Sequence, residues 1–410
     1  MDRRRRRLPG VRRDMQFVAT VYEGKQVVVA QDPIGLGTEP IVLTPEGAAL
    51  LGLVDRCQTM GDLQDQVTLL FGARSPAIDE LEALVTELDR QLLLDSDRYR
   101  EARRSFVESF EVAPLRQASC AGSAYPATPG ELEARLAGIV ASNGNEAAEA
   151  CPLAVVAPHI DIRVGEAGYA AAYGALRGAR PELVVILGVG HAMGSESFCA
   201  TEKDFETPLG MVRTDTARVR RLRDAGAIAF ARSDFPHRRE HSIEFQLVFL
   251  QHVLANPRFC IVPVLCGSFH RELTKVTRAS EISGVREVLR EIRSWVTAAP
   301  GEVLLIAGVD LSHVGPKFGH EKDAQALVRE SEAHDRALLE ALLSGRVEAF
   351  WGEAKRVEDY YNVCGFSALA CLAEILPPVR GRLLHYGVWH EPPTRSAVSF
   401  AAARFDALED

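Results

Sequence analysis

The feature that most constrains the fold is a series of short, almost entirely apolar runs separated by stretches with helical spacing. A strand that is buried on both faces needs such a run, because neither of its faces meets water. Four runs have this character: Leu153–Ala157, Leu183–Leu187, Cys260–Leu265 and Val303–Ala307. Helical patterns alternate with them over Gly165–Leu176, Thr214–Ala225, Ser242–Leu254, Ser283–Val296 and Glu321–Leu343, and two more strands are expected at Leu383–Trp389 and Ser396–Ala402. The pattern predicts an α/β domain over residues 115–410, with a mixed, largely parallel sheet flanked by helices.

Residues 15–98 have a different pattern and predict a small separate domain. Thr44 and Pro45 mark the start of a helix, since threonine caps a first turn and proline fits the first helical position. The other expected elements are strands at Met15–Tyr22 and Lys25–Ala30 and helices at Met60–Leu70 and Pro76–Leu93. Two strands and three short helices predict a winged-helix-like domain. A DNA-binding winged helix would carry a basic recognition helix, whereas residues 60–70 hold two aspartates and no Lys or Arg. A packing or dimerisation module is the alternative.

Charge is distributed unevenly along the chain. The whole sequence carries a net charge of -9, although its first 13 residues hold seven arginines and one aspartate. An acidic chain lacks the main contribution to broad nucleic-acid binding, the neutralisation of phosphates, so no nucleic-acid partner is expected. The Arg3–Arg7 run could tether the chain to a nucleic acid or a membrane, but a disordered basic tail over residues 1–14 is the simpler interpretation. Residues 99–114 are charged, end at Pro114 and are expected to form a linker.

Cysteine spacing indicates a reducing compartment, and the length of the apolar runs argues against a membrane-spanning helix. The eight cysteines include no CxxC pair, which fits neither a disulfide framework nor a zinc ribbon. No stretch reaches the length of about 18 apolar residues that a spanning helix needs, and no apolar segment follows the arginine run as it would in a secretory signal. The sequence therefore predicts a cytoplasmic protein that has no membrane partner.

Histidines follow three of the predicted strands at the point where each strand ends. His159 follows the first apolar run, His191 follows the second, and His313 follows the fourth together with Asp310. Ligands of open α/β sheets bind beyond the carboxyl ends of the strands, so these side chains are expected to meet at one edge. A single histidine at a strand end is more often structural than a ligand. Three together are costly to bury unless something coordinates them, and imidazole, thiolate and carboxylate suit borderline metal ions.

Two further segments could contribute to the same site. Glu240 and His241 precede a helical run for which Ser242 is the expected N-cap, which would leave both residues on a loop. Cys364 directly precedes a helix rich in small residues, and a helix N-terminus would lower its thiol pKa and favour the thiolate that binds metals. A buried, inert cysteine is the alternative. Nearby His237 is flanked by arginines and is expected to be exposed, while three other cysteines lie in apolar runs and are assigned to the core: Cys260, Cys266 and Cys371.

Seven blocks occur in a fixed order over roughly residues 116–406. They are Cys120-Ala121-Gly122-Ser123-Ala124-Tyr125-Pro126, Ala157-Pro158-His159, Leu187-Gly188-Val189-Gly190-His191, Glu240-His241-Ser242-Ile243-Glu244, Asp310-Leu311-Ser312-His313, Val363-Cys364-Gly365 and Ser396-Ala397-Val398-Ser399-Phe400-Ala401-Ala402. In this order they resemble the Memo family, whose prokaryotic members are called AmmeMemoRadiSam system protein B. Residues 15–98, through Leu43-Thr44-Pro45-Glu46-Gly47-Ala48 and Leu92-Leu93-Leu94-Asp95, resemble PqqD-like domains, which hold peptide substrates in radical-enzyme maturation systems.

The Memo resemblance implies a fold similar to class III extradiol dioxygenases, in which two His and a Glu hold ferrous iron and a further His acts as acid or base. It implies that His159 and His191 bind the metal and that Cys364 takes the place of the third ligand. It also makes His313 the acid/base residue, with Asp310 beside it. A thiolate in place of a carboxylate favours softer ions, so copper and zinc are alternatives to Fe(II).

The chain departs from the family pattern at two places. His159 is followed by Ile160-Asp161-Ile162 where the family usually has Ala-Gly-Tyr, and His191 is followed by Ala192 where a second His is common. The second change removes a candidate proton relay. Asp161 and Arg163 add charges that could bind an ionic substrate or form an ordinary surface pair.

Three functions remain open at this point. The first is a metal-dependent oxidoreductase, dioxygenase-like, in which His313 moves protons at a near-neutral pKa, Asp310 orients it, and Glu240 and His241 complete the catalytic set. The second is a non-catalytic scaffold whose cleft receives a peptide or protein segment. The third is zinc-assisted hydrolysis with His313 and Glu240 activating water, although no HExxH signature occurs. A small molecule or peptide is the expected substrate, and a radical SAM protein and an AMMECR-like protein are the expected partners.

Overall fold

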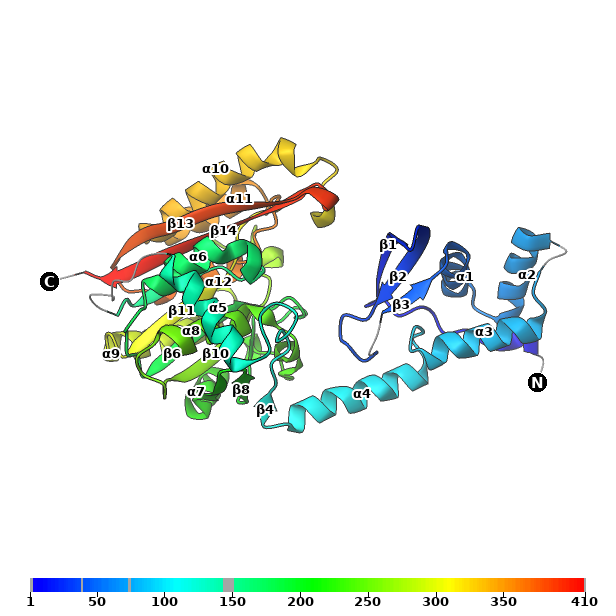
Figure 1. Ribbon diagram of the computed structural model, residues 1–410, viewed down its shortest axis with the longest axis horizontal. Helices are drawn as coiled ribbons and strands as arrows, with labels where there is room; N and C mark the ends of the chain where they lie inside the picture. Colours follow the sequence, from blue (N-terminus) through cyan, green and yellow to red (C-terminus); the bar gives the residue numbers. More distant parts are fainter. Residues whose placement is uncertain (1–2, 38–39, 73–74, 143–150, 409–410) are drawn as a thin grey trace. The chain divides into compact units, whose positions relative to one another are not determined.

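The chain folds into two compact units. The computed structural model describes residues 3–37, 40–72, 75–142 and 151–408 (Figure 1). The first unit comprises Met1–Val112 and the second comprises Ala113–Asp410, and each has a hydrophobic core of its own. Separate cores are expected for a chain of this length, since single cores stop growing at about 250–300 residues.

The first unit joins a three-stranded antiparallel sheet to a set of helices. The strands β1 (Gln16–Tyr22), β2 (Lys25–Gln31) and β3 (Ile41–Leu43) pair in sequence order. They are followed by α1 (Pro45–Arg56), α2 (Met60–Phe71), α3 (Ile78–Arg90) and α4 (Asp97–Val112). Thr44 caps α1 as predicted, because its side-chain oxygen accepts the backbone N–H of Gly47. The core is built mainly from α1, α2 and α3, through side chains such as Val54, Val67 and Val85.

The prediction of a disordered tail over residues 1–14 is wrong at Val11 and Arg12. Val11 is buried in the core of the first unit, and the Arg12 side chain is 2% exposed. The Arg12 guanidinium donates to Asp14 and to Asp32, each at 2.9 Å. The run of arginines in the sequence indicated a solvated segment. The fold places two carboxylates against the Arg12 side chain, and this allows it to be buried.

Most of the segment predicted as a linker, residues 99–114, forms the helix α4, which belongs to the first unit. Arg100 pairs with Asp97 at 2.9 Å and Arg104 pairs with Glu101 at 3.1 Å. Opposite charges three residues apart stabilise a helix along its surface, and this spacing was the overlooked signal. The division between the two units falls where α4 ends, after Val112.

The second unit is built on one large mixed sheet, which confirms the predicted α/β fold. Its strand order is β12-β14-β5-β11-β6-β10-β9-β8-β4, with β13 paired to β14 and β7 paired to β10. Four neighbouring strands run parallel, namely β5 (Ala154–Ala157), β11 (Val303–Gly308), β6 (Leu183–Val189) and β10 (Cys260–Cys266). The long antiparallel pair β13 (Val379–Glu391) and β14 (Ser396–Ala407) extends the sheet beside β5 (Figure 1). The short strands are β4 (Leu115–Arg116), β7 (Phe198–Ala200), β8 (Asp204–Thr207), β9 (Gly210–Thr214) and β12 (His313–Val314).

Helices cover both faces of this sheet. Successive residues of β6 belong to different core clusters, as expected for a strand buried on both sides: Leu183 and Val185 belong to one, Val184 and Ile186 to the other. The cluster with Val184 is completed by α5 (Pro129–Ala141), α6 (Ile162–Gly174) and α8 (His241–Val253). The cluster with Leu183 is completed by α7 (Thr216–Ala225), α9 (Val285–Ala298), α10 (Ala324–Leu343), α11 (Val347–Arg356) and α12 (Phe366–Ile375). The apolar runs and helical patterns of this domain all form strands and helices, whereas α5, α11 and the short strands β4, β7, β8, β9 and β12 had no predicted counterpart.

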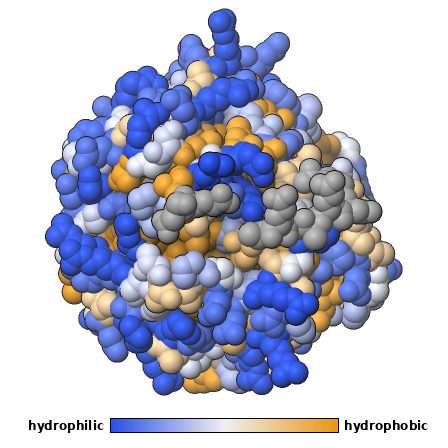
Figure 2. All heavy atoms as spheres, turned by 90° about the vertical axis from the view of Figure 1, so that its left-hand side faces the viewer, coloured by the Kyte–Doolittle hydropathy of each residue, from blue (hydrophilic) through white to orange (hydrophobic). Residues whose placement is uncertain are grey.

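Hydrophilic side chains dominate the face of the second unit that lies at the left of Figure 1. Figure 2 shows this face, on which hydrophobic areas are scattered between larger hydrophilic ones. Among the residues that the structure describes, no helix has both the length and the apolar composition to cross a membrane.

Candidate metal centre

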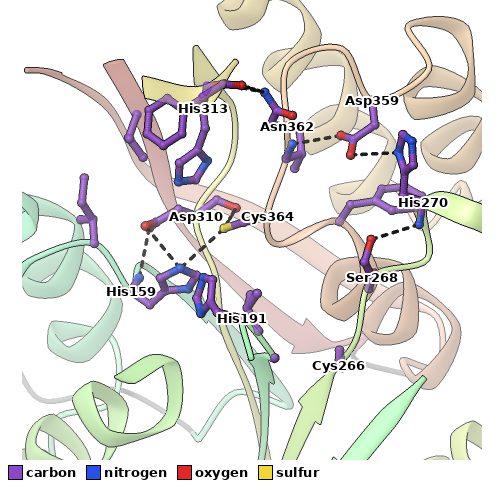
Figure 3. A pocket seen from close by; sticks show the side chains of 18 of the residues that line it. His159, His191, Cys266, Ser268, His270, Asp310, His313, Asp359, Asn362 and Cys364 are labelled. Carbon is purple, nitrogen blue, oxygen red and sulfur yellow. Dashed lines mark hydrogen bonds and ion pairs between the residues drawn. The ribbon is translucent and has the colours of Figure 1, made fainter. Parts of the chain in front are cut away.

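Three parallel strands end at one edge of the central sheet and deliver the polar residues that the sequence singled out. β5, β11 and β6 are neighbours, and the segments that follow them carry His159, Asp310, His313 and His191. All four side chains line one cleft, together with Cys364 (Figure 3). The cleft has a volume of about 860 Å³, which is ample for a small molecule.

His159 is held in one ring orientation by the end of the neighbouring strand. Its side chain is 3% exposed, and its Nδ1 lies 3.0 Å from the carbonyl oxygen of Gly308. Its backbone N–H donates to Asp310 Oδ1 at 3.0 Å. Burial lowers the pKa of His159 well below its ordinary value, so the ring is neutral. When the Nδ1–H of a neutral imidazole donates to a carbonyl, the lone pair is on Nε2. This is the tautomer that binds a metal ion through Nε2.

His191 is oriented in the same way, but by a carboxylate. Its Nδ1 lies 3.0 Å from Glu240 Oε2, and its backbone N–H donates to the same oxygen at 3.1 Å. Burial lowers the pKa of His191, but the hydrogen bond and the negative charge of Glu240 outweigh it and raise the pKa above its ordinary value. Burial raises the pKa of Glu240, but the contacts with His191 lower it by more than burial raises it. The carboxylate therefore stays ionised. The pair therefore directs the Nε2 atom of His191 away from Glu240.

Cys364 reaches the centre from the loop between α11 and α12. Its Sγ lies 3.5 Å from His159 Nε2 and 3.6 Å from the carbonyl oxygen of Asp310. Asn362 in this loop adopts a left-handed φ of 50°, which asparagine tolerates better than most residues. The Asn362 amide donates to the carbonyl oxygens of His313 and Phe318, both at 3.2 Å. The loop that carries Cys364 is thus fastened to the segment that carries His313.

The expectation of a lowered thiol pKa at Cys364 is wrong for the protein without a bound cation. Burial raises the pKa of this thiol well above its ordinary value, and the nearby charge of Asp310 adds to the effect. A helix N-terminus contributes only a partial positive charge, whereas withdrawing a thiolate from water costs more. A thiolate at this position needs a cation beside it.

The donor atoms fit a transition-metal ion. The ligand atoms of His159, His191 and Cys364 all lie within 4.8 Å of one another. With bonds of about 2.1 Å to nitrogen and about 2.3 Å to sulfur, a tetrahedral ion separates the two donors by about 3.6 Å. The observed distance between His159 Nε2 and Cys364 Sγ is 3.5 Å. A tetrahedral ion held by these three residues would keep a fourth coordination position for another ligand.

Glu240 and His241 occupy different places in the site. Glu240 Oε1 accepts the backbone N–H of Ser242 at 2.9 Å and caps α8, so the helix begins at His241 and the predicted cap at Ser242 is wrong. His241 lines the cleft, and its ring stacks on that of His191 with centroids 5.0 Å apart. His191, Glu240 and His241 form a second group of close ligand atoms, but both Glu240 oxygens already contact His191 Nδ1. Glu240 therefore acts on the site through His191.

His313 and Asp310 both line the cleft, but Asp310 does not orient His313 as predicted. His313 Nδ1 lies 2.9 Å from the carbonyl oxygen of Leu311, and the Asp310 carboxylate accepts the backbone N–H of His159 instead. Burial lowers the pKa of His313 to about 4, so the near-neutral value that was expected is wrong. Burial also raises the pKa of Asp310 to about 7, although the hydrogen bond from His159 partly opposes this rise.

Comparison with known proteins identifies the family. Residues 116–404 match the family model described as Memo-like protein. The chain belongs to the Memo-like family. It is 28% identical over 380 residues to a MEMO1 family protein of Aquifex aeolicus, covering 92% of this chain and 95% of the relative. It is 31% identical over 346 residues to the MEMO1 family protein TTHA0924 of Thermus thermophilus, covering 83% and 97%. With a MEMO1 family protein of Nitrosopumilus maritimus it shares 26% over 301 residues, covering 71% and 99%.

The family predicted from the seven sequence blocks is thereby confirmed. The alignment with the Aquifex relative is longer than the second unit, so this Memo-like chain shares part of its first unit with that relative as well.

The remaining walls of the Memo-like cleft differ in chemical character. Four side chains provide an apolar wall: Ile160, Phe318, Trp389 and Val398. Polar side chains also line the cleft, among them His270, whose Nδ1 lies 3.5 Å from Asp359 Oδ2 (Figure 3). Sequence reasoning missed these residues, because they come from distant segments and share no local spacing.

The charged residues Asp161 and Arg163 pair with each other at the rim. Asp161 lines the cleft and caps α6, while the Arg163 side chain is 66% exposed. A second rim pair, Lys317 with Glu391 at 2.9 Å, was not predicted. The rim thus carries both signs of charge.

His237 lies outside the cleft and is buried, so its predicted exposure is wrong. It is 1% exposed, and its Nε2 lies 3.1 Å from the carbonyl oxygen of Cys199. The neighbouring arginines in the sequence gave no information about this side chain. Cys266 and Cys371 are buried as predicted, whereas Cys260 is partly buried.

Proposed function

We propose that His159, His191 and Cys364 bind a metal ion and that the protein performs metal-dependent redox chemistry on a small molecule in the cleft. One observation carries this proposal. Acceptors behind both imidazoles hold their Nδ1 atoms, and a thiol lies at coordination spacing from Nε2 of His159. Iron(II) is the proposed ion, and the same imidazole and thiolate donors also suit copper and zinc.

The cleft residues supply positioning and proton handling around that ion. A bound iron ion would supply one-electron chemistry and open coordination positions. His313 would hold or move a proton at Nε2, because its Nδ1 is occupied by the Leu311 carbonyl. Ile160, Phe318 and Trp389 would exclude water from one side of a bound molecule.

Zinc-assisted hydrolysis has less support than redox chemistry. That mechanism requires Glu240 to activate water, whereas both Glu240 oxygens contact His191 and the side chain is 3% exposed. A redox role makes no such demand on Glu240.

Partner proteins are proposed from the family resemblance alone. A radical SAM protein and an AMMECR-like protein remain the expected partners, with the first unit as the recruiting module. Pull-downs with the full chain and with a chain that lacks the first unit test this, and recovery of the same proteins by both would end the recruitment proposal.

Metal analysis of protein purified without a metal-binding tag tests the central proposal. The wild type is expected to carry a single ion per chain, and His159→Ala and Cys364→Ala are expected to lose it. Matched controls are His390→Ala, an exposed histidine, and Cys260→Ala, a partly buried thiol, neither of which lines the cleft. Wild-type protein that folds normally, stays metal-free and takes up no added Fe(II), Cu or Zn would refute the proposal and favour the scaffold function.

A further inference from the structure

The buried carboxylate of Asp335 lies outside the cleft and has no role in the proposed function described so far. Asp335 belongs to α10 and is 0% exposed. Its partners are three hydroxyl groups. Asp335 Oδ1 accepts from Ser312 Oγ at 2.6 Å, and Oδ2 accepts from Tyr386 at 2.8 Å and from Ser399 Oγ. These hydroxyls come from the loop after β11 and from the paired strands β13 and β14, so one carboxylate joins all three to α10.

The Ser312 end of this network lies within the segment that carries the site. Ser312 stands between Asp310 and His313, and Ser312 and Leu311 together are tied to Ser399 of β14 by three further hydrogen bonds. Ser312 N–H donates to Ser399 Oγ at 2.9 Å, Ser399 N–H donates to the Ser312 carbonyl at 2.9 Å, and Leu311 N–H donates to the Ser399 carbonyl at 2.8 Å. Asp335 accepts from both serine hydroxyls, so it fixes the loop and its partner strand together.

The same loop sets the spacing of two proposed ligands. Asp310 Oδ1 accepts the backbone N–H of His159 at 3.0 Å, and the Asp310 carbonyl accepts the backbone N–H of Gly365 at 3.1 Å. The Cys364 thiol also points to that carbonyl at 3.6 Å (Figure 3). Displacing the loop at Ser312 therefore moves the anchor of both His159 and Cys364, and it moves the carbonyl of Leu311 that orients the His313 ring.

We propose that Asp335 is a positioning residue of the metal centre, which holds the Asp310–His313 loop in register through Ser312 and Ser399. The inference rests on the proposed function for its effect on metal binding. A carboxylate suits the task because it accepts from all three hydroxyls at once. An amide of the same shape has one acceptor oxygen, and its NH2 group would oppose the hydroxyl protons on the other side.

Cobalt(II) titration of the full chain tests this inference, with Co(II) as a spectroscopic probe for the cysteine thiolate. Asp335→Asn and Ser312→Ala are expected to weaken Co(II) binding about tenfold or more, which is the usual cost of losing an outer partner of a metal site. Tyr386→Phe is the matched control, because it removes one hydrogen bond to the same carboxylate but leaves the Ser312 bond intact. It is expected to change Co(II) affinity by less than about threefold.

A second readout needs no metal. The ring NMR signals of His313, assigned with His313→Gln, are expected to shift in metal-free Asp335→Asn and Ser312→Ala but not in Tyr386→Phe. Unchanged signals and affinity in Asp335→Asn, or equal effects in Tyr386→Phe, would show a merely structural carboxylate and overturn the inference. Wild-type protein that binds no Co(II) would count against the proposed metal centre, and the metal-free NMR comparison would still decide the role of Asp335. Ser312→Ala carries the test if Asp335→Asn does not fold.

Discussion

Replacing Glu240 by glutamine is the sharpest perturbation of the proposed centre, because it alters a ligand's support and leaves the ligands themselves in place. Glu240 Oε2 accepts hydrogen bonds from the Nδ1 and the backbone N–H of His191. Its Oε1 accepts the backbone N–H of Ser242. Glutamine keeps one acceptor oxygen, so either Ser242 or His191 must face an NH2 group that cannot accept. A buried hydrogen bond to a charged group contributes about 1.5–3 kcal/mol. Because about 1.4 kcal/mol corresponds to a factor of ten, we expect Glu240→Gln to weaken metal binding about 10- to 100-fold.

Competition titration with a chromophoric chelator measures this loss. Glu353→Gln is the matched control, because Glu353 Oε1 also lies against a histidine, 2.8 Å from His334 Nδ1, but the pair does not line the cleft. The control is expected to bind metal like the wild type, and thermal unfolding of metal-free protein separates affinity from stability. Wild-type affinity in Glu240→Gln would refute the reasoning that the carboxylate orients His191.

Three further predictions concern other parts of the molecule. Gly365→Ala would place a Cβ 2.5 Å from Val309 Cβ and 2.6 Å from the Asp310 carbonyl oxygen, so we expect a loss of about 1–3 kcal/mol in unfolding free energy together with weaker metal binding. Gly352→Ala, where no atom of the described residues lies within 4 Å of the added Cβ, is its control in chemical denaturation. Metal added at 100 times its dissociation constant is expected to stabilise the wild type by about 2.7 kcal/mol in thermal unfolding, and an equal gain in Cys364→Ala would contradict the assigned ligand. In the first unit, burial raises the pKa of Asp14 and Asp32, but hydrogen bonds from Arg12 lower both pKa values below the ordinary range. Their stabilising contribution is therefore present above about pH 4 and is lost as pH falls through the folded-state pKa values, and acid titration of hydrogen exchange in this unit should lose that dependence in Arg12→Met.

The sequence predicted the central fold well because burial on both faces leaves a strong local signal. The short apolar runs of β5, β6, β10 and β11 predicted inner strands. Because these strands run parallel, the residues that follow them lie at the same edge of the sheet. Local rules also predicted the Thr44 cap, since a cap depends on a few adjacent residues.

What the sequence could not predict depends on partners brought together by folding. Arg12 in an arginine-rich segment is buried because Asp14 and Asp32 meet it, and His237 is buried although arginines flank it. The orientation of His313 depends on the carbonyl of Leu311, and a backbone carbonyl leaves no mark in the sequence. The position of Glu240 behind His191 likewise required the helix cap to lie two residues earlier than the predicted cap at Ser242.

The Nδ1 atoms of the two proposed histidine ligands are hydrogen-bonded to acceptors of unequal strength. His159 faces an amide carbonyl, and His191 faces an ionised carboxylate. The carboxylate draws the Nδ1 proton more strongly, which makes the opposite nitrogen of His191 the more electron-rich of the two donors. An ion bound by both would receive more electron density from His191, which follows β6, than from His159, which follows β5. The two imidazoles would therefore bind the same ion with unequal strength.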